Sequence, residues 1–191
     1  MERIGLFGGS FDPVHLGHLL VAQAAREELE LTRLCFIPAA QSPFKPDQQP
    51  APGAQRLRLL RLALAGAAWC EIDSQELQRG GISYTIDTVR DYCRRYPGAE
   101  LFYLIGTDHV EQLHRWREAE ALARLVQFAL IPRPGQAVTA LPAPFRGQSL
   151  TGFPLRLSAS QIRARAKAGL PIAHLTPPAV AEAICSNRLY L

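Results

Sequence analysis

Short apolar runs alternate along this chain with longer segments in which apolar residues recur at helical spacing. Residues 3–7, 34–37, 69–73, 101–105 and 126–131 are nearly all apolar, as strands buried on both faces of a sheet are. Helical patterns follow at residues 16–29, 57–68, 85–96, 108–125, 158–167 and 178–185.

This alternation predicts an α/β fold with a Rossmann-like, doubly wound parallel sheet of about five or six strands and helices on both faces. A chain of 191 residues is long enough to bury one core, and we expect a single domain over residues 1–191. Pro-rich or Gly-rich stretches at residues 38–52 and 133–154 are predicted to be loops.

The composition excludes several classes of protein. No apolar stretch reaches about 18 residues and no signal-peptide pattern is present, so we expect a cytoplasmic protein without a membrane partner. The cysteines at positions 35, 70, 93 and 185 form no C-x-x-C pair, which favours reduced packing residues over a zinc or redox site.

The net charge of +4 comes from 19 Arg and 2 Lys against 17 acidic residues. Basic residues are dispersed among acidic ones, without the basic stripe of a nucleic-acid groove. Anionic small molecules are therefore the expected partners, rather than nucleic acid. A basic nucleic-acid-binding protein is the alternative, and tight salt-dependent binding of DNA would reveal it.

The segment at residues 8–18, GGSFDPVHLGH, lies where the first strand passes into the first helix. Ligands of open α/β sheets bind at this end of the strands. Its two glycines let backbone N–H groups approach phosphate oxygens, and the helix that follows offers unpaired N–H donors. His15 and His18 are three residues apart and share one face of the first turn, with Gly17 leaving room between them. The segment predicts a phosphate-binding site.

Two other interpretations of these histidines stay open. Each histidine alone could cap or pack the helix, and the pair could bind zinc. A zinc site needs a third ligand at metal spacing, whereas Asp12 precedes Pro13 and the next histidines, His109 and His114, lie a whole βα unit away. We therefore expect no metal ion held by protein ligands.

Residues 15–18, HLGH, carry the H-x-G-H motif of the nucleotidylyltransferase superfamily, which the segment resembles. Class I aminoacyl-tRNA synthetases share a related motif, but a chain of this length cannot hold their tRNA-binding domains. Residues 157–163, LSASQIR, are similar to the I-S-S-T-x-x-R motif that opens a late helix in this superfamily. Ser158 at the N-cap, Ser160 in the first turn and Arg163 would form an anion-binding helix terminus, although capping alone would also explain Ser158.

Two more segments extend the resemblance. Gly106-Thr107-Asp108 matches a G-x-D segment of the superfamily, which implies that Asp108 holds the ribose of ATP; an N-cap role is the alternative. Lys45 aligns with the lysine of a P-H-K segment, which binds phosphates. The chain departs from this pattern at Phe44, which stands where the family has a histidine donor.

Residues 82–88, ISYTIDT, and Trp116 resemble the nicotinate mononucleotide adenylyltransferase family within this superfamily. An indole face attracts a pyridinium cation by about 0.5 to 2 kcal/mol, and the N–H groups at a helix start near Thr85 suit a carboxylate. Core packing is the alternative for Trp116. Residues 133–135, RPG, also match the family, which places Arg133 near the adenine or the pyridine ring.

The resemblance implies the reaction of ATP with nicotinate mononucleotide to give nicotinate adenine dinucleotide and pyrophosphate, with Mg²⁺ bound mainly through ATP phosphates. It implies catalytic roles for His15, His18, Lys45 and Arg163. The ATP-binding residues would be Gly8, Gly9, Ser10, Phe11, Gly17, Gly106, Asp108, Ser158 and Ser160. The acceptor-binding residues would be Ser83, Tyr84, Thr85, Trp116 and Arg133.

Three alternatives stay open beside this hypothesis. Pantetheine-phosphate adenylyltransferases and cytidylyltransferases share the H-x-G-H motif, and a panel of acceptors would separate them. A non-catalytic nucleotide sensor on the same fold would bind ATP without turnover. The sequence leaves the oligomeric state open, a homo-oligomer included.

Overall fold

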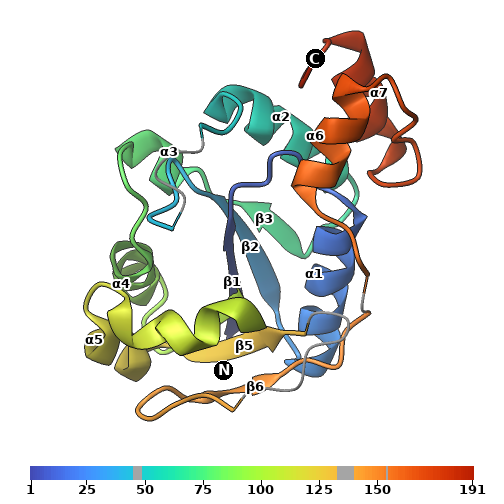
Figure 1. Ribbon diagram of the computed structural model, residues 1–191. Coiled ribbons are helices and arrows are strands. Elements are labelled where there is room, and N and C mark those ends of the chain that lie inside the picture. Colours follow the sequence, from blue (N-terminus) through green and yellow to red (C-terminus); the bar gives the residue numbers. More distant parts are fainter. Residues whose placement is uncertain (45–48, 133–139, 154) are drawn as a thin grey trace.

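A computed structural model describes residues 1–44, 49–132, 140–153 and 155–191 of the chain (Figure 1). Its centre is a parallel sheet of six strands in the order β3-β2-β1-β4-β5-β6. The strands are β1 (Arg3–Gly9), β2 (Arg33–Pro38), β3 (Cys70–Ile72), β4 (Glu100–Gly106), β5 (Gln127–Ile131) and β6 (Gly147–Ser149). The predicted doubly wound fold is confirmed, because the strand order reverses direction between β1 and β4.

Helices cover both faces of this sheet. They are α1 (Leu16–Glu28), α2 (Gly53–Ala63), α3 (Gln75–Arg79), α4 (Thr85–Arg95), the 3₁₀ helix η1 (Thr107–Arg115), α5 (Ala119–Leu125), α6 (Ala159–Lys167) and α7 (Pro178–Ser186). Alternate residues of each strand point to opposite faces, so Leu6 and Phe7 enter different core clusters. One cluster packs α1, α2, α6 and α7 against the sheet, and the other packs α4, η1 and α5.

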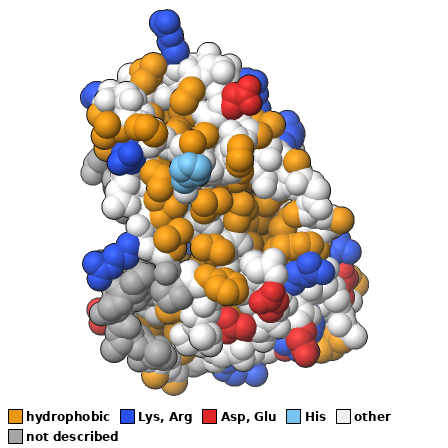
Figure 2. Space-filling view, turned by 90° about the vertical axis from the view of Figure 1, so that its right-hand side faces the viewer, with side chains coloured by type: hydrophobic (Ala, Val, Ile, Leu, Met, Phe, Trp, Pro, Cys, Tyr) orange, Lys and Arg blue, Asp and Glu red, His pale blue; other side chains and the backbone are white. Residues whose placement is uncertain are grey.

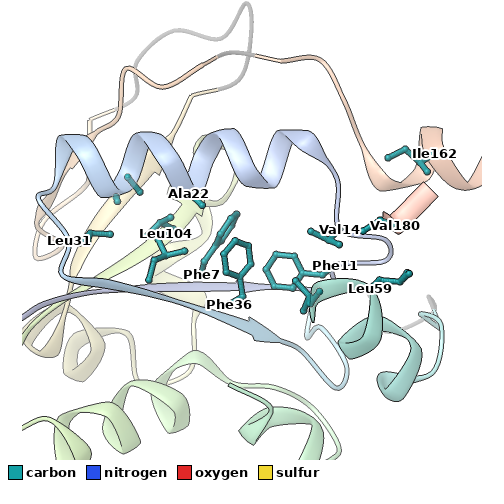
Figure 3. Close-up of a cluster of buried hydrophobic side chains, with 14 of the residues drawn as sticks. Phe7, Phe11, Val14, Ala22, Leu31, Phe36, Leu59, Leu104, Ile162 and Val180 are labelled. Atoms are coloured by element: carbon teal, nitrogen blue, oxygen red, sulfur yellow. The ribbon is translucent and has the colours of Figure 1, made fainter. Parts of the chain in front are cut away.

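Figure 3 shows the first of these clusters from the side. The rings of Phe7 and Phe36 lie between α1 and the sheet, and Phe11 continues this layer beyond the end of β1. Val14 points toward Ile162 of α6 and Val180 of α7. Buried contacts therefore fix the loop after β1 to the two C-terminal helices.

Two predicted helices differ from the structure, and two observed elements were not predicted. The helix expected over residues 108–125 is two helices, η1 and α5, because Trp116 is extended and Glu118 is left-handed with φ of 51°. The helix expected over residues 57–68 begins at Gly53 and ends at Ala63. The structure also contains α3 and β6, which the sequence pattern did not predict.

Two features of the described residues bear on the class of protein. No helix among them is both long enough and apolar enough to cross a membrane. On the face turned toward the viewer in Figure 2, Lys and Arg side chains lie apart from one another instead of forming a stripe. Among the described side chains, this face therefore shows no continuous basic stripe of the kind that tracks a nucleic-acid backbone.

Candidate active site

The loop between β1 and α1 forms one wall of a cleft of about 1200 Å³. The helix termini of α1 and α6 both open onto it, so motifs near the two ends of the sequence meet across one space. The lining includes these residues of the predicted site: Ser10, Phe11, His15, Gly17, His18, Gly106, Ser158, Ser160 and Arg163.

His15 and His18 lie against each other in this cleft. Their rings stack with centroids 3.8 Å apart and an interplanar angle of 27°. The backbone N–H of His15 donates to Nδ1 of His18 at 3.2 Å, so the neutral His18 ring carries its proton on Nε2. A Cβ on Gly17 would lie 3.0 Å from two atoms of the His15 ring, which explains the need for a glycine between the histidines.

Both histidines are neutral at pH 7. Burial lowers the pKa of His15 to about 4, even though a backbone hydrogen bond opposes the shift. Burial, followed by the proximity of His15, also holds the pKa of His18 well below 6.5. The ring of Phe11 contacts His18 edge-on, with centroids 5.0 Å apart, and shields it. The pair thus offers N–H donors that carry no charge of their own.

This burial predicts a pH dependence of stability. Below pH 6.5 the unfolded chain binds a proton on His15 that the folded protein does not take up until about pH 4, and the lowered pKa of His18 acts in the same direction. Stability should therefore fall as the pH drops from about 6.5 toward 4. Urea unfolding of the wild type and of a His15→Gln, His18→Gln double variant would measure it. The difference in unfolding free energy between them should change across this range, and a constant difference would contradict the expected shift.

The terminus of α6 faces the histidines. Ser158 caps the helix by accepting from the backbone N–H of Gln161 at 3.3 Å, and its Oγ lies 3.0 Å from Oγ of Ser160. Arg163 donates from Nη1 to the backbone carbonyl of Asp12 at 2.7 Å. The predicted capping role of Ser158 is present, and the hydroxyl pair and the guanidinium line the cleft beside it.

Two residues that the sequence did not single out hold the loop after β1 in place. Arg56 is 2% exposed and donates to the carbonyls of Ser10, at 2.7 Å, and Ala51, at 2.8 Å. Tyr190 lines the cleft and donates its hydroxyl to the carboxylate of Asp12 at 2.8 Å. An arginine inside an amphipathic helix and a tyrosine near the C-terminus carry no sequence signal for such roles.

A second cavity, of about 210 Å³, adjoins the cleft at the carboxyl ends of β1 and β4. Its lining includes these residues of the predicted site: Gly8, Gly9, Ser10, Ser83, Thr85, Gly106 and Trp116. The residues that line both spaces are Phe7, Ser10, Ala39, Ser42, Gly106 and Ile131. Position 8 requires glycine because a Cβ there would lie 2.5 Å from the hydroxyl oxygen of Tyr103.

Thr85 and Ser83 approach the second cavity in different ways. Thr85 begins α4, and its hydroxyl donates to the hydroxyl of Tyr103 at 3.2 Å. The Ser83 hydroxyl accepts from the backbone N–H of Ala40 at 3.0 Å. It also hydrogen-bonds the carboxyl group of Glu76, so it fixes the loop after β2.

Glu76 is a further residue of this cavity that the sequence did not indicate. It is buried, and its carboxyl group accepts from the hydroxyl of Thr88 at 2.6 Å. Burial raises the pKa of Glu76, although the bonds from Thr88 and Ser83 oppose the shift. A buried carboxyl group thus lies at the wall of a cavity whose described lining contains no other acidic residue.

The remaining predicted residues lie elsewhere. The ring of Tyr84 packs against the guanidinium of Arg117, 4.7 Å from the ring centroid, and is outside the lining of both cavities. Asp108 is exposed in η1, with its carboxylate 3.9 Å from Nε2 of His109, and is also outside that lining. Lys45 and Arg133 lie outside the described residues.

The two spaces suit two kinds of ligand. In the cleft, the N–H donors of a helix terminus meet the rings of His15 and His18, the hydroxyls of Ser158 and Ser160 and the guanidinium of Arg163, as a polyphosphate requires. The second cavity has an indole, Trp116, beside the start of α4, as an aromatic ligand with an anionic group requires. Among the described residues, no group of three or more His, Cys, Asp or Glu side chains is arranged to hold a metal ion.

Comparisons with known proteins agree with this geometry. Residues 6–165 match the family model of cytidylyltransferase-like proteins. The chain is 39% identical to the probable nicotinate-nucleotide adenylyltransferase of Herpetosiphon aurantiacus, with 100% of both chains covered. It is 40% identical to that of Shouchella clausii, with 100% of this chain and 97% of the relative covered.

A solved structure has the same fold at lower sequence identity. The nicotinic acid mononucleotide adenylyltransferase of Plasmodium falciparum, complexed with NaAD, superposes with a TM-score of 0.80 at 17% identity. The match covers 100% of this chain and 98% of that one. On the family model and the full-length relatives, the chain belongs to the cytidylyltransferase-like family and, within it, to the nicotinate-nucleotide adenylyltransferases.

Proposed function

We propose that this protein transfers the adenylyl group of ATP to nicotinate mononucleotide, forming nicotinate adenine dinucleotide and pyrophosphate. The observation that carries the proposal is the contact between a phosphate-binding cleft and an aromatic cavity at the carboxyl ends of β1 and β4. Ser10 and Gly106 line both spaces, so ligands bound in the two would meet there. The relatives' names agree with this reaction.

In the proposed reaction, a 5′-phosphate oxygen of nicotinate mononucleotide attacks the α-phosphorus of ATP. The bond from this phosphorus to the oxygen that bridges to the β-phosphate breaks, and pyrophosphate leaves. The attacking phosphate is already ionised at pH 7, so no general base and no covalent enzyme intermediate is needed. Alignment of the two nucleotides can supply about 7 to 11 kcal/mol of the rate enhancement.

We assign the Nε2–H of His18 to the α-phosphate, where negative charge increases in the transition state. His15, Ser160 and Arg163 would bind the other phosphates, together with Lys45. Gly17 would keep the backbone close to them. Gly8 and Gly9, which line the second cavity, and Asp108, which lies outside both linings, are assigned to ATP from the resemblance. We assign Trp116 and the start of α4 at Thr85 to the nicotinate ring and its carboxylate.

The donors that line the cleft suit phosphate oxygens better than a metal cation. Its carboxylate, Asp12, already accepts from Tyr190 and lies 3.9 Å from Nη1 of Arg163. Mg²⁺ would therefore be held through the phosphates of ATP, where it neutralises charge on the leaving pyrophosphate.

An acceptor panel tests the reaction and its specificity together. Purified protein is incubated with ATP, Mg²⁺ and either nicotinate or nicotinamide mononucleotide, and the dinucleotide is measured by mass. We expect kcat/KM to be at least about tenfold higher for nicotinate mononucleotide, because a charge-assisted hydrogen bond is about twice as strong as a neutral one.

Phosphopantetheine with ATP, and CTP in place of ATP, serve as the controls of this panel. Turnover of either in preference to nicotinate mononucleotide would replace the proposed reaction by a related one. ATP binding measured by calorimetry without turnover of any acceptor would identify a nucleotide sensor instead. Equal use of the two pyridine nucleotides would leave adenylyl transfer in place and remove the assigned selectivity for the carboxylate.

A further inference from the structure

Phe44 lies at the acceptor cavity and is outside the lining of the phosphate cleft. Its ring is 41% exposed, although it contacts two aromatic neighbours. Its centroid lies 5.3 Å from that of His109 and 5.6 Å from that of Trp116. In the P-H-K segment that this loop resembles, the same position holds a histidine next to a phosphate-binding lysine. In the structure, the phenyl ring instead extends the wall that Trp116 begins.

In the wall of the acceptor cavity, Trp116 is held by its aromatic neighbours, and within the described chain Trp116 and His109 each have an unsatisfied ring nitrogen. Trp116 meets the edges of Tyr103 and Phe128, with centroids 6.1 Å and 6.3 Å away, which hold its indole in place. Nε1 of Trp116 and Nδ1 of His109 are buried and have no hydrogen-bond partner among the described residues. Buried polar groups are normally satisfied, so these two atoms leave hydrogen-bonding capacity unused in residues that form the wall of the cavity.

The spacing of the rings limits how a ligand can bind. Stacked aromatic planes need about 3.5 Å each, and the 5.6 Å between Phe44 and Trp116 leaves no room for a third ring between them. The planes of the two rings are inclined at 39°, so they form adjacent parts of one concave surface. A flat aromatic cation placed on Trp116 would contact Phe44 at its edge, and electron-rich ring faces attract such a cation.

We propose that Phe44 is a specificity-determining residue of the acceptor site, where its ring forms a continuous wall with Trp116 and His109 and contacts the pyridinium ring of the acceptor. The proposal rests on the proposed function, since it takes the acceptor to be a mononucleotide with a cationic aromatic base. On this proposal, Phe44, which stands where the family has histidine, affects the binding of the acceptor and not the binding of ATP.

Intrinsic fluorescence provides a direct test without turnover. The chain has two tryptophans, Trp69 and Trp116, so a Trp69→Phe background leaves the indole of the acceptor wall as the sole tryptophan fluorophore. Nicotinate mononucleotide and ATP are titrated separately into this protein and into its Phe44→Ala variant. We expect Kd for nicotinate mononucleotide to rise about five- to tenfold, through loss of one ring contact, and Kd for ATP to stay within about twofold.

Matched variants keep the result interpretable. Phe153→Ala removes another half-exposed phenyl ring, one that lines the phosphate cleft, and should leave Kd for nicotinate mononucleotide within about twofold. Phe44→His, which restores the family residue, should weaken nicotinate mononucleotide binding less than Phe44→Ala, because the imidazole keeps a flat ring at the wall. If Phe44→Ala lowers the melting temperature markedly, Phe44→Leu keeps apolar volume without the ring and replaces it in the comparison.

The outcomes separate this inference from the proposed function. Unchanged or tighter binding of nicotinate mononucleotide by Phe44→Ala would overturn the role of Phe44, with the proposed reaction left standing. A weaker Kd for ATP alone would place Phe44 at the phosphates and overturn the inference in the same way. Failure of the protein with native Phe44 to bind nicotinate mononucleotide would overturn both.

Discussion

Substitution of His18 by alanine is expected to lower kcat by about 10²- to 10³-fold, with a much smaller effect on KM for ATP. The reason lies in the tautomer that the fold imposes. Because the backbone N–H of His15 donates to Nδ1 of His18, the proton of the neutral ring is fixed on Nε2. That donor is assigned to the α-phosphate, on which charge builds only as the transition state is approached. Steady-state kinetics with both substrates varied would measure the effect.

Two amide substitutions separate the donor from the helix cap. Asparagine at position 18 can accept from the backbone N–H of His15, but it has no group at the position of Nε2. Glutamine can place an N–H near that position. We therefore expect His18→Gln to retain more of kcat than His18→Asn, and His18→Asn to retain more of the stability.

The exposed His174 supplies the control for the loss of a histidine as such, and His174→Ala should leave kcat unchanged. Near-full kcat in His18→Ala would contradict the assignment of His18. Loss of a stoichiometric zinc ion from that variant would contradict it too, because it would identify the pair as metal ligands.

The hydrophobic pattern predicted the sheet because its central strands are buried on both faces. β1, β2, β4 and β5 are almost entirely apolar, and each lies within a residue or two of its predicted position. β6 was missed because the edge strand Gly147–Ser149 is short and mostly polar. α3 was missed because five residues are too few to show helical periodicity.

The break between η1 and α5 has no local signal either. Residues 115–118, RWRE, contain neither proline nor glycine, so the sequence has no residue there that would end a helix. Glu118 adopts the left-handed conformation, and its carboxylate pairs with Arg90 of α4, at 2.6 Å. This break places Trp116 at the second cavity. The predicted stacking residue is therefore positioned by the break between η1 and α5, which the sequence did not predict.

The candidate site was predictable where its residues lie within one short segment. His15, Gly17 and His18 are close because a single helical turn brings them together, whereas the buried charges depend on contacts between distant parts of the chain. Glu76 meets Ser83 and Thr88 only after α3 folds against α4. Ser83, predicted to bind the acceptor, lines the second cavity, and its hydroxyl also bonds to Ala40 and Glu76, a contact that the sequence did not indicate.

Arg56 shows this dependence on tertiary structure most strongly, and its removal is expected to cause the largest loss of stability. Arg56→Ala should lower the free energy of unfolding by about 3 to 5 kcal/mol. The side chain is 2% exposed, so alanine leaves a cavity as well as two partly buried carbonyls, of Ser10 and Ala51, without their donor. Each unsatisfied buried group costs about 1 to 3 kcal/mol.

Arg58 on the same helix provides the matched control. It is exposed and donates to the side chain of Asn187 at 3.2 Å, so Arg58→Ala should change stability by less than about 0.5 kcal/mol. Urea unfolding of both variants measures the difference. A loss in Arg56→Ala within about 1 kcal/mol of that in Arg58→Ala would mean that water replaces the guanidinium at both carbonyls.

Lysine at position 56 tests what the guanidinium contributes beyond its charge. The Ser10 and Ala51 carbonyls accept from different nitrogens, Nη1 and Nε, and one ammonium group cannot occupy both positions. Arg56→Lys should therefore lose stability to an intermediate extent. Ser10 lines both the cleft and the acceptor cavity, so a shift of its backbone would displace the two nucleotides together. We accordingly expect the folded fraction of Arg56→Lys to show a raised KM for ATP and for nicotinate mononucleotide alike. A change in only one of the two KM values would mean that the loop after β1 keeps its position without the two hydrogen bonds from Arg56.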